Sequence, residues 1–387
     1  MNSGKYVFAQ LTQFLPQRIF DTIVSRYNGD KHIRHFSCWN QMLCMLFGQL
    51  THRDSLRDLI VVLEAHSRKS YHLGLGKSVT RSNLSKANEK RNYRIFEEFA
   101  YHLISIARKK NFNSDFEIKG QVYAFDSSTI DLCLSVFWWA TFRKKKAGIK
   151  LHTLYDVVTH IPAFIHITEA TVNDMNAMDV IPYQTGAYYV FDRGYVDYAR
   201  LYRITLHEAY FVVRAKSNLK FNRMYSLKVD KTTGVLCDQI GKLSGIQTVK
   251  QYAKKIRRVK YHDFETNRTF VFLTNNMDLT ALQIALLYKN RWQVELFFKW
   301  IKQHLKVKSF WGTSENAVRI QIYSAIITYC LVAIVRAELK IDRSTYEILQ
   351  VIGISLLDKT PINKLFINTD YKNNEDENHK QLNISWI

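Results

Sequence analysis

The chain has 387 residues, of which 47% are hydrophobic, and its 55 Lys and Arg against 34 Asp and Glu give a formal charge of +21. So large an apolar fraction can bury a substantial core, which excludes a disordered arm. The positive charge favours a polyanionic partner, and nucleic acid is favoured over an anionic membrane surface because no juxtamembrane polybasic block is present.

The cysteines and the N-terminus indicate a protein of a reducing compartment. The five cysteines are scattered and include no C-x-x-C pair, which argues against a disulfide framework and against a zinc site. The first residues, MNSGKYVFAQLTQFLP, contain no apolar run and no cleavage motif of a signal peptide. We therefore expect a cytoplasmic protein.

Residues 1–115 are predicted to form helices, because FSCWNQMLCMLFGQL and SLRDLIVVLEA carry apolar residues at helical spacing. Asp54 and Ser82 are the expected N-caps of two helices on either side of the break HLGLGKS, a helix-turn-helix-like layout. The second of these helices is basic, through Arg81, Lys86, Lys90, Arg91 and Arg94. Such a helix either contacts DNA or is an ordinary solvated face.

Strand-like runs begin near residue 121. They are QVYAFD, TIDLCL, LHTLYDV, AFIHITE, AYYVFD and AYFVVRA. Several are apolar on both faces, as central strands covered by helices are, and the first five could include an antiparallel meander with turns such as THIP. The predicted class is α/β.

The rest of the chain is expected to hold a β-rich insertion and two long helices. Residues of about 212–275 are polar, basic and strand-prone, whereas 279–305 and 314–340 have helical patterns. Within the second helix the run IYSAIITYCLVAIV falls short of the ~18 apolar residues that span a bilayer, so a buried core helix is expected and no membrane span. The polar tail after Thr369 is expected to be flexible.

Four polar residues share one face of the first predicted helix. Tyr288, Arg291, Glu295 and Lys302 follow one another at intervals of three, four and seven residues. A carboxylate among phosphate-binding groups, held on a rigid helix, suits a nucleic-acid backbone. Glu and Lys seven residues apart are also common on solvated helix surfaces, so the spacing alone leaves both readings open.

Two aspartates end strand-like runs in the same way, Asp126 in QVYAFD and Asp192 in AYYVFD. Sites on open sheets form at strand ends, and Gly194 would let the chain turn sharply after Asp192. Either aspartate alone could be a turn residue. Together with Glu295 they form a possible three-carboxylate cluster, the ligand type that Mg²⁺ or Mn²⁺ prefers, and two such ions can carry out phosphoryl transfer.

These motifs resemble a known family. With YAFDSSTIDL, FDRGY and the Tyr-Arg-Glu-Lys row, the chain resembles bacterial insertion-sequence transposases of the DDE type, in the branch marked by a Tyr-Arg-Glu-Lys signature. The resemblance covers residues 120–340, and KLHTLYDV and IPAFIHITEATVNDM are similar to the second and third strands of that family.

The resemblance implies a domain organisation. It implies an all-α DNA-end-binding domain over residues 1–115, and a ribonuclease-H-like mixed sheet flanked by helices over 116–345, with the β-rich insertion at about 212–275. A C-terminal helix and a partly flexible tail would occupy 346–387.

It also implies roles for particular residues. Two Mg²⁺ or Mn²⁺ ions would be held by Asp126, Asp192 and Glu295. The DNA phosphates would be held by Tyr288, Arg291 and Lys302, with further DNA contacts from Lys299 and Arg193. The partners would be double-stranded DNA, as element ends and target, and a second copy of the chain in a homodimer on paired ends. The family cleaves at its terminal inverted repeats, commonly through a hairpin, and joins the freed 3′-hydroxyls to target DNA.

One family feature is missing. In relatives a Trp of the insertion stacks on a flipped base, but this chain has no Trp between residues 212 and 275. Either an aromatic residue takes that role or the hairpin step differs, and the candidates are Phe221, Tyr225, Tyr252, Tyr261 and Phe264.

Other assignments remain open at this stage. The chain could be a nuclease of the same fold without strand transfer, or a catalytically silent DNA-binding protein. Weaker metal-ligand candidates are Asp131, Asp156 and Asp174. The strand histidines His152, His160 and His166 are expected to be solvated or hydrogen-bonded, and Trp292 and Trp300 to lie in the core.

Overall fold

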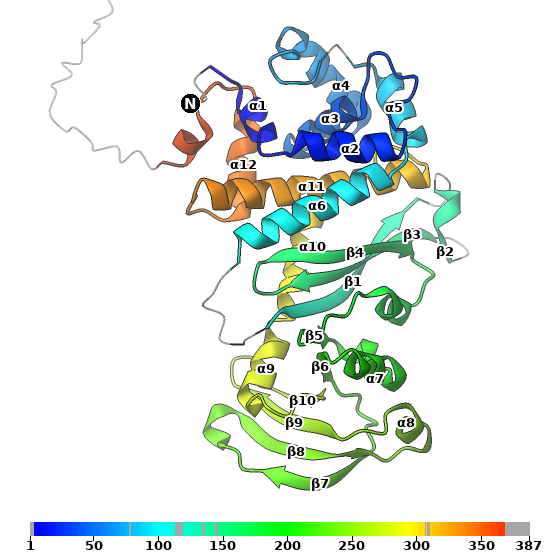
Figure 1. The fold of residues 1–387 in the computed structure, drawn as a ribbon, viewed down its shortest axis with the longest axis vertical. Helices are drawn as coiled ribbons and strands as arrows, with labels where there is room; N and C mark the ends of the chain where they lie inside the picture. Colours follow the sequence, from blue (N-terminus) through cyan, green and yellow to red (C-terminus); the bar gives the residue numbers. More distant parts are fainter. Residues whose placement is uncertain are drawn as a thin grey trace, which may run out of the picture.

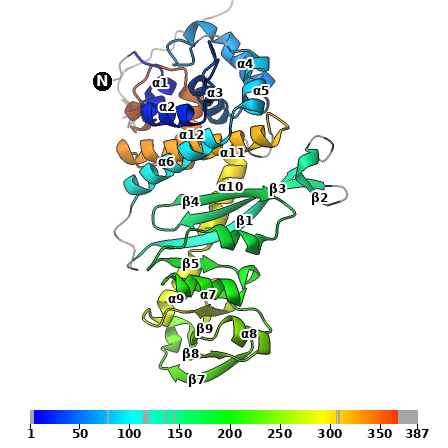
Figure 2. The ribbon, with the colours of Figure 1, turned by 45° about the vertical axis from the view of Figure 1, so that its right-hand side comes forward.

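The computed structural model describes residues 4–76, 79–112, 118, 120–133, 135, 137–143, 146–305, 307 and 310–367. The molecule is elongated (Figures 1 and 2). The N-terminal helices lie together with the helices Glu315–Glu338 and Thr345–Ser355 at one end, the first strands cross the middle, and the strands of the insertion form the other end.

The N-terminal region is helical, as predicted. Its helices are α1 (Val7–Thr12), α2 (Gln17–Arg26), α3 (Cys38–Leu50), α4 (Leu56–Ala65), α5 (Arg81–Lys90) and α6 (Arg94–Lys110). The predicted caps were wrong by one and two residues, because Ser55 caps α4 and Thr80 caps α5, each by accepting a hydrogen bond from the backbone N–H three residues on.

Arg91 does not belong to the basic surface predicted for the second helix. It is buried, and its guanidinium donates hydrogen bonds to the Ser37 carbonyl and the Gln41 side chain, each at 3.0 Å. Arg91 therefore joins the end of α5 to the start of α3. The other four predicted cations of this helix region are exposed: Arg81, Lys86, Lys90 and Arg94.

The strands form one mixed sheet. They are β1 (Val122–Leu132), β2 (Thr141–Arg143), β3 (Lys146–Asp156), β4 (Ile161–Glu169), β5 (Tyr188–Phe191), β6 (Tyr210–Arg214), β7 (Phe221–Leu227), β8 (Val235–Leu243), β9 (Ile256–Asp263) and β10 (Arg268–Thr274). Strands β1, β3 and β4 make an antiparallel meander, and β5 and β6 run parallel to β1 on its other side. The order β4-β3-β1-β5-β6 is that of a ribonuclease-H-like fold, so the predicted class is confirmed.

Strand β1 is longer than its sequence suggests. It pairs with β3 without a break from Tyr123 to Leu132, so QVYAFD and TIDLCL are one strand instead of two. Strand β5 pairs with β1 only as far as Phe125. The prediction that Asp126 ends a strand was therefore wrong. It is the first residue of β1 beyond the parallel partner.

The insertion extends the same sheet, because β10 pairs with β6 and is followed outward by β9, β8 and β7. A buried ion pair joins β9 to β8 within the insertion: Arg257 and Asp238 lie 2.6 Å apart with side chains 3% and 5% exposed. Arg257 also donates a hydrogen bond to the Leu279 carbonyl at 2.6 Å, just before α9. The insertion and the next helix are thus fixed by one guanidinium.

The C-terminal helices are α9 (Ala281–Lys289), α10 (Trp292–His304), α11 (Glu315–Glu338) and α12 (Thr345–Ser355). Helix α11 packs along α6 and against α3 and α5 (Figure 1). It is 24 residues long with a mean hydropathy of 1.8 in its most apolar window, so the helix passes a test of length and composition for a membrane span, although the apolar run within it is shorter. Since 94% of that window is buried inside the protein, it is a core helix, as predicted. The tail after Thr369 lies outside the described residues.

The single helix predicted over 279–305 is broken into α9 and α10 at Asn290 and Arg291. Here the backbone hydrogen bonds span three residues, as in a 3-10 helix. The Arg291 N–H donates to the Tyr288 carbonyl, and the Val294 N–H donates to the Arg291 carbonyl. Trp292 follows the break and is 58% exposed, so its predicted core position was wrong. Trp300 packs edge-on against Tyr329 and is partly buried.

Candidate active site

Three carboxylates predicted as ligands come from three elements of the fold. Asp126 belongs to β1, Asp192 follows β5 directly, and Glu295 lies in the first turn of α10, which packs on β1 and β3. In the parallel ladder Phe125 pairs with Phe191. Asp126 and Asp192 are therefore the next residues on two neighbouring strands.

Tyr288 and Arg291 link these carboxylates. The Tyr288 hydroxyl donates a hydrogen bond to Asp192 Oδ1 at 2.9 Å. The Arg291 guanidinium pairs with Asp126 Oδ2 at 3.0 Å through one nitrogen and with Glu295 through another. These bonds make two groups, one of Tyr288 with Asp192 and one of Arg291 with Asp126 and Glu295. The Arg291 guanidinium lies over the Tyr288 ring, 5.7 Å from its centroid, so the two groups adjoin and the five residues form one cluster.

The two aspartates differ electrostatically. Burial raises the pKa of Asp126 above its ordinary value, and the charges of Glu295 and Asp192 raise it further, against the Ser127 backbone N–H and Arg291, which lower it. Burial also acts to raise the pKa of Asp192, but the hydrogen bond from Tyr288 and the charge of Arg291 leave that pKa below its ordinary value. The cluster holds three carboxylates and one guanidinium, so an added cation would stabilise it.

Tyr195 and Arg214 are neighbours that sequence reasoning missed. The Tyr195 hydroxyl donates to Ser127 Oγ at 3.1 Å and lies 3.5 Å from Asp126 Oδ1. Arg214 is the last residue of β6, and its guanidinium contributes to the low pKa of Asp192. Tyr195 could have been found as part of FDRGY, and Arg214 as the charged end of YFVVR, the strand-like run after AYYVFD.

The remaining predicted DNA-contacting residues lie around the cluster. Lys302 Nζ donates a hydrogen bond to the Thr129 carbonyl of β1 at 2.8 Å. Lys299 is exposed on α10, one helical turn after Glu295. Arg193 is exposed directly after Asp192 and lines a small cavity.

The donor set suits a hard divalent cation, because carboxylate oxygens are the ligands that Mg²⁺ and Mn²⁺ prefer. Across the part of the chain that is described, no three Asp, Glu, His or Cys side chains stand close enough together to hold a metal ion. In this arrangement Arg291 is the counter-ion of Asp126 and Glu295. The ligand types therefore fit a metal, and Arg291 would have to release the carboxylates for one to bind.

The weaker candidates have structural partners or lie apart. Asp156 pairs with Arg108 at 2.8 Å, and Asp174 pairs with Lys150 at 3.0 Å. His152 is buried and hydrogen-bonded to Thr168 at 2.9 Å, and burial lowers its pKa to about 4. This histidine is thus neutral near pH 7 and has the hydrogen-bonded role that was expected.

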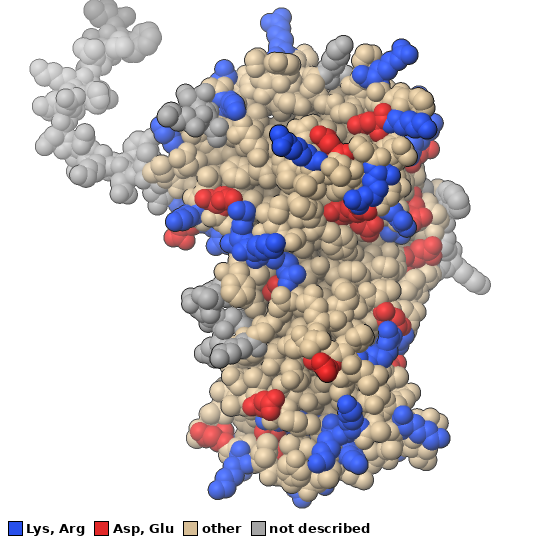
Figure 3. Space-filling view, in the orientation of Figure 1, with Lys and Arg blue, Asp and Glu red and all other residues tan. Residues whose placement is uncertain are grey.

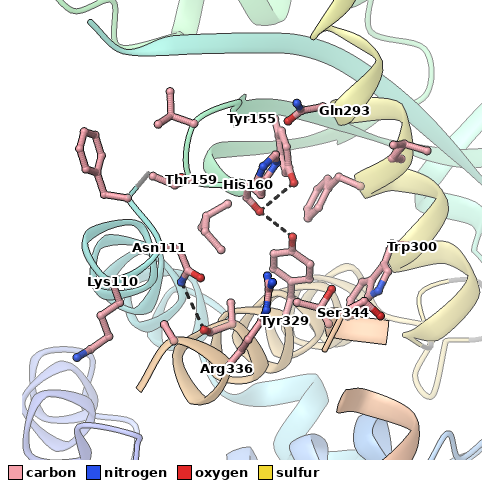
Figure 4. A pocket seen from close by; sticks show the side chains of 18 of the residues that line it. Lys110, Asn111, Tyr155, Thr159, His160, Gln293, Trp300, Tyr329, Arg336 and Ser344 are labelled. Atoms are coloured by element: carbon pink, nitrogen blue, oxygen red, sulfur yellow. Dashed lines mark hydrogen bonds between the residues drawn. The ribbon is translucent and has the colours of Figure 1, made fainter. Parts of the chain in front are cut away.

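A cavity of about 880 Å³ lies beside α10 (Figure 4). Its walls come largely from the β3–β4 turn, α10 and α11, and none of the described residues that line it is an Asp or Glu. The His160 carbonyl there accepts hydrogen bonds from the hydroxyls of Tyr155 and Tyr329, both at 2.8 Å (Figure 4). These bonds hold the turn to α11, and the cavity lacks the ligands that phosphoryl transfer on metal ions requires.

Family models match two parts of the chain. A model described as "Transposase DDE domain" matches residues 117–331, more than half of the chain and including all of the clustered residues. A second, described as "Domain of unknown function (DUF4372)", matches residues 3–76.

Curated relatives agree. A protein of Sinorhizobium fredii named as transposase y4zB is 36% identical over 273 residues, covering 69% of this chain and 74% of the relative. A Geobacillus stearothermophilus protein named for insertion sequence element IS5377 is 32% identical over 53% of this chain and 54% of its own length. A Synechocystis protein named for insertion sequence element IS4SA is 27% identical over 66% of this chain and 72% of its own length.

The family match includes Asp126, Asp192 and Glu295, and the relatives include proteins named for insertion-sequence transposition. The chain belongs to the DDE transposase family, in agreement with the resemblance found in its sequence.

Proposed function

We propose that this transposase binds the terminal inverted repeats of its own element and catalyses metal-dependent cleavage and strand transfer at Asp126, Asp192 and Glu295. The observation that carries the proposal is the convergence of these three carboxylates, from β1, β5 and α10, on Tyr288 and Arg291. No nucleophilic side chain is needed, because the attacking group is a water or a DNA 3′-hydroxyl.

DDE transposase domains generally use divalent metal ions. We propose two Mg²⁺ or Mn²⁺ ions held by the three carboxylates, which would activate the attacking oxygen and stabilise the leaving oxygen. Tyr288 would keep Asp192 oriented and ionised through its hydrogen bond. Arg291, once freed from Asp126 and Glu295, is placed to bind a DNA phosphate, the role that the family resemblance gives it.

The proposed partner is double-stranded DNA, bound by a homodimer on paired ends. Lys and Arg side chains lie toward both ends of the face in Figure 3, over the N-terminal helices and over the insertion strands. The exposed cations of the α5 region, Arg81, Lys86, Lys90 and Arg94, are suited to phosphate contacts by the N-terminal helices. The proposed domains are those inferred from the sequence, with 1–115 binding the element end.

Removal of divalent metal is expected to abolish cleavage of element-end DNA without abolishing binding. The carboxylates cannot activate water by themselves, whereas the Lys and Arg contacts to phosphate need no metal. A labelled duplex with the element's end, incubated in EDTA and then with added Mg²⁺ or Mn²⁺, measures this. Cleavage that proceeds undiminished in EDTA would contradict the metal assignment.

Tyr288→Phe is expected to lower the cleavage rate roughly 10- to 100-fold, because a hydrogen bond to a charged group contributes about 1.5–3 kcal/mol. The ring still packs on Phe272, so the fold is expected to be kept. Single-turnover cleavage of prebound DNA measures the rate, with Tyr71→Phe as the matched control because Tyr71 is 82% exposed. Equal rates for the two variants would remove Tyr288 from the site.

A further inference from the structure

A second cavity, of about 380 Å³, opens where the core sheet meets the insertion. Among the residues that the structure describes, no acidic residue lines it, and four cationic residues do: Arg193, Arg214, Lys216 and Arg258. We call it the basic cavity. Its apolar wall includes Leu219 and Phe221.

The basic cavity adjoins the carboxylate cluster because of strand register. Phe125 pairs with Phe191 on β5, and Phe191 pairs with Val213 on β6. The next residues on these three parallel strands are Asp126, Asp192 and Arg214. The row of catalytic candidates thus continues directly into the wall of the basic cavity, and Arg193 follows Asp192 in the chain.

The insertion supplies the opposite wall through Arg258 of β9. One Arg258 nitrogen donates to Gln239 Oε1 at 2.8 Å, whereas its Nε is buried without a hydrogen-bond partner. The adjacent Arg257 is fully neutralised by Asp238, but Arg258 forms no ion pair with any described residue. An unused buried N–H donor beside an unpaired charge is costly unless a ligand accepts from it.

The other cations of the cavity form no ion pair with any residue that the structure describes, although the Arg214 charge acts on Asp192. The Arg214 guanidinium lies over the Phe270 ring, 5.0 Å from its centroid, and Lys216 Nζ donates to the Val196 carbonyl at 3.1 Å. Like charges gathered in one hollow repel one another, so an anion bound there would be stabilised by all four. The volume is of the order of one nucleotide's phosphate and sugar.

We propose that the basic cavity binds one backbone phosphate of the DNA strand that passes Asp192, and so sets the position of that strand along the carboxylates. The inference rests on the proposed function, since DNA at the site supplies the phosphate. Arg214, Lys216 and Arg258 are assigned as positioning residues, with Arg258 making the insertion part of the strand-binding surface.

The test removes one phosphate charge from the DNA, one cationic side chain from the protein, or both. Element-end duplexes carrying one uncharged methylphosphonate at successive positions around the cleavage point are bound to wild type, Arg258→Gln and Arg214→Gln in EDTA, so that no chemistry intervenes. Lys242→Gln and Lys254→Gln are matched controls, because both lysines are exposed on the insertion outside the cavity. Fluorescence anisotropy gives each affinity over a range of salt concentrations.

We expect wild type to bind the duplex about tenfold more weakly when the methylphosphonate stands at one or two particular positions. Arg258→Gln is expected to bind unmodified DNA more weakly than wild type by a similar factor. A methylphosphonate at those positions should weaken its binding no further, because the two changes remove the same contact. The slope of log affinity against log salt concentration should be smaller for this variant by about one unit, the change expected for one lost phosphate contact. Arg258→Lys, which keeps the charge, should recover most of the affinity. Lys216→Gln changes an exposed residue of the cavity and leaves the half-buried Arg258 in place.

Two results would overturn the proposal. In the first, the losses of affinity from the neutral phosphate and from the side-chain change add at every position. In the second, the cavity variants bind DNA as tightly as the control variants do. Adding Mg²⁺ to the same wild-type complexes separates this inference from the proposed function. If Arg258→Gln and the neutral phosphate are coupled in binding but wild type never cleaves, the basic cavity stands and the catalytic function fails. If wild type cleaves and the two changes are not coupled, the function stands and the cavity does not bind phosphate.

Discussion

Asp192→Asn is expected to reduce cleavage and joining of element-end DNA by about 10³-fold or more while leaving end binding intact. The amide has the shape of the carboxylate and can still accept the Tyr288 hydrogen bond, so the fold should persist. It lacks the charge that a divalent cation requires from its ligand. Asp126→Asn and Glu295→Gln are expected to give similar losses, because residues that act as one unit fail together.

Asp131→Asn is the matched control for these variants. It removes one carboxylate from the same strand as Asp126, at an exposed position. We expect its cleavage rate to remain within a factor of about two of wild type. Substantial activity in any one of the three cluster variants, measured under single-turnover conditions, would remove that residue from the catalytic set.

Arg257→Met is expected to destabilise the protein by about 3–5 kcal/mol, the usual result of breaking a buried ion pair on one side. Asp238 would remain buried with no partner for its charge, and the Leu279 carbonyl would lose its donor. Urea denaturation followed by circular dichroism measures the change. Arg268→Met, at an exposed position of β10, is the control and should change stability by less than about 0.5 kcal/mol.

The double variant Arg257→Met with Asp238→Leu distinguishes the ion pair from simple packing. Replacing both charges by apolar groups should recover much of the stability that the single change removes. A double variant no more stable than Arg257→Met would contradict the account, because it would show that the unpaired Asp238 charge is not what destabilises the single variant.

Two of the three candidate carboxylates, Asp192 and Glu295, were selected by local signals that agree with the structure. Asp192 follows a short apolar strand before Arg-Gly-Tyr, and Glu295 lies four residues from Arg291 and seven from both Tyr288 and Lys302 on an amphipathic run. The spacings correctly predicted that Tyr288 and Arg291 lie on the helix face that carries Glu295, even though the helix is interrupted at Asn290 and Arg291. Local periodicity survives such a break because only one turn tightens.

The errors have tertiary causes. The position of Asp126 within a long strand depends on where β5 stops pairing, which no local pattern encodes. Arg91 looks like a surface cation, but carbonyls at the start of α3 bury it. The pair of Arg257 and Asp238 and the row ending in Arg214 join strands whose register appears only when the sheet is assembled. Charge and composition cannot separate such residues from a solvated basic surface.

The most direct test is incubation of the purified wild-type chain with Mg²⁺, a labelled duplex carrying the element's own end, and a circular target plasmid. We expect a break at the element end, followed by covalent joining of its 3′ strand to the plasmid, as sequencing of the junctions would show. A chain that binds the end but neither cuts nor joins it would contradict catalysis at Asp126, Asp192 and Glu295, and cleavage without joining would indicate a nuclease.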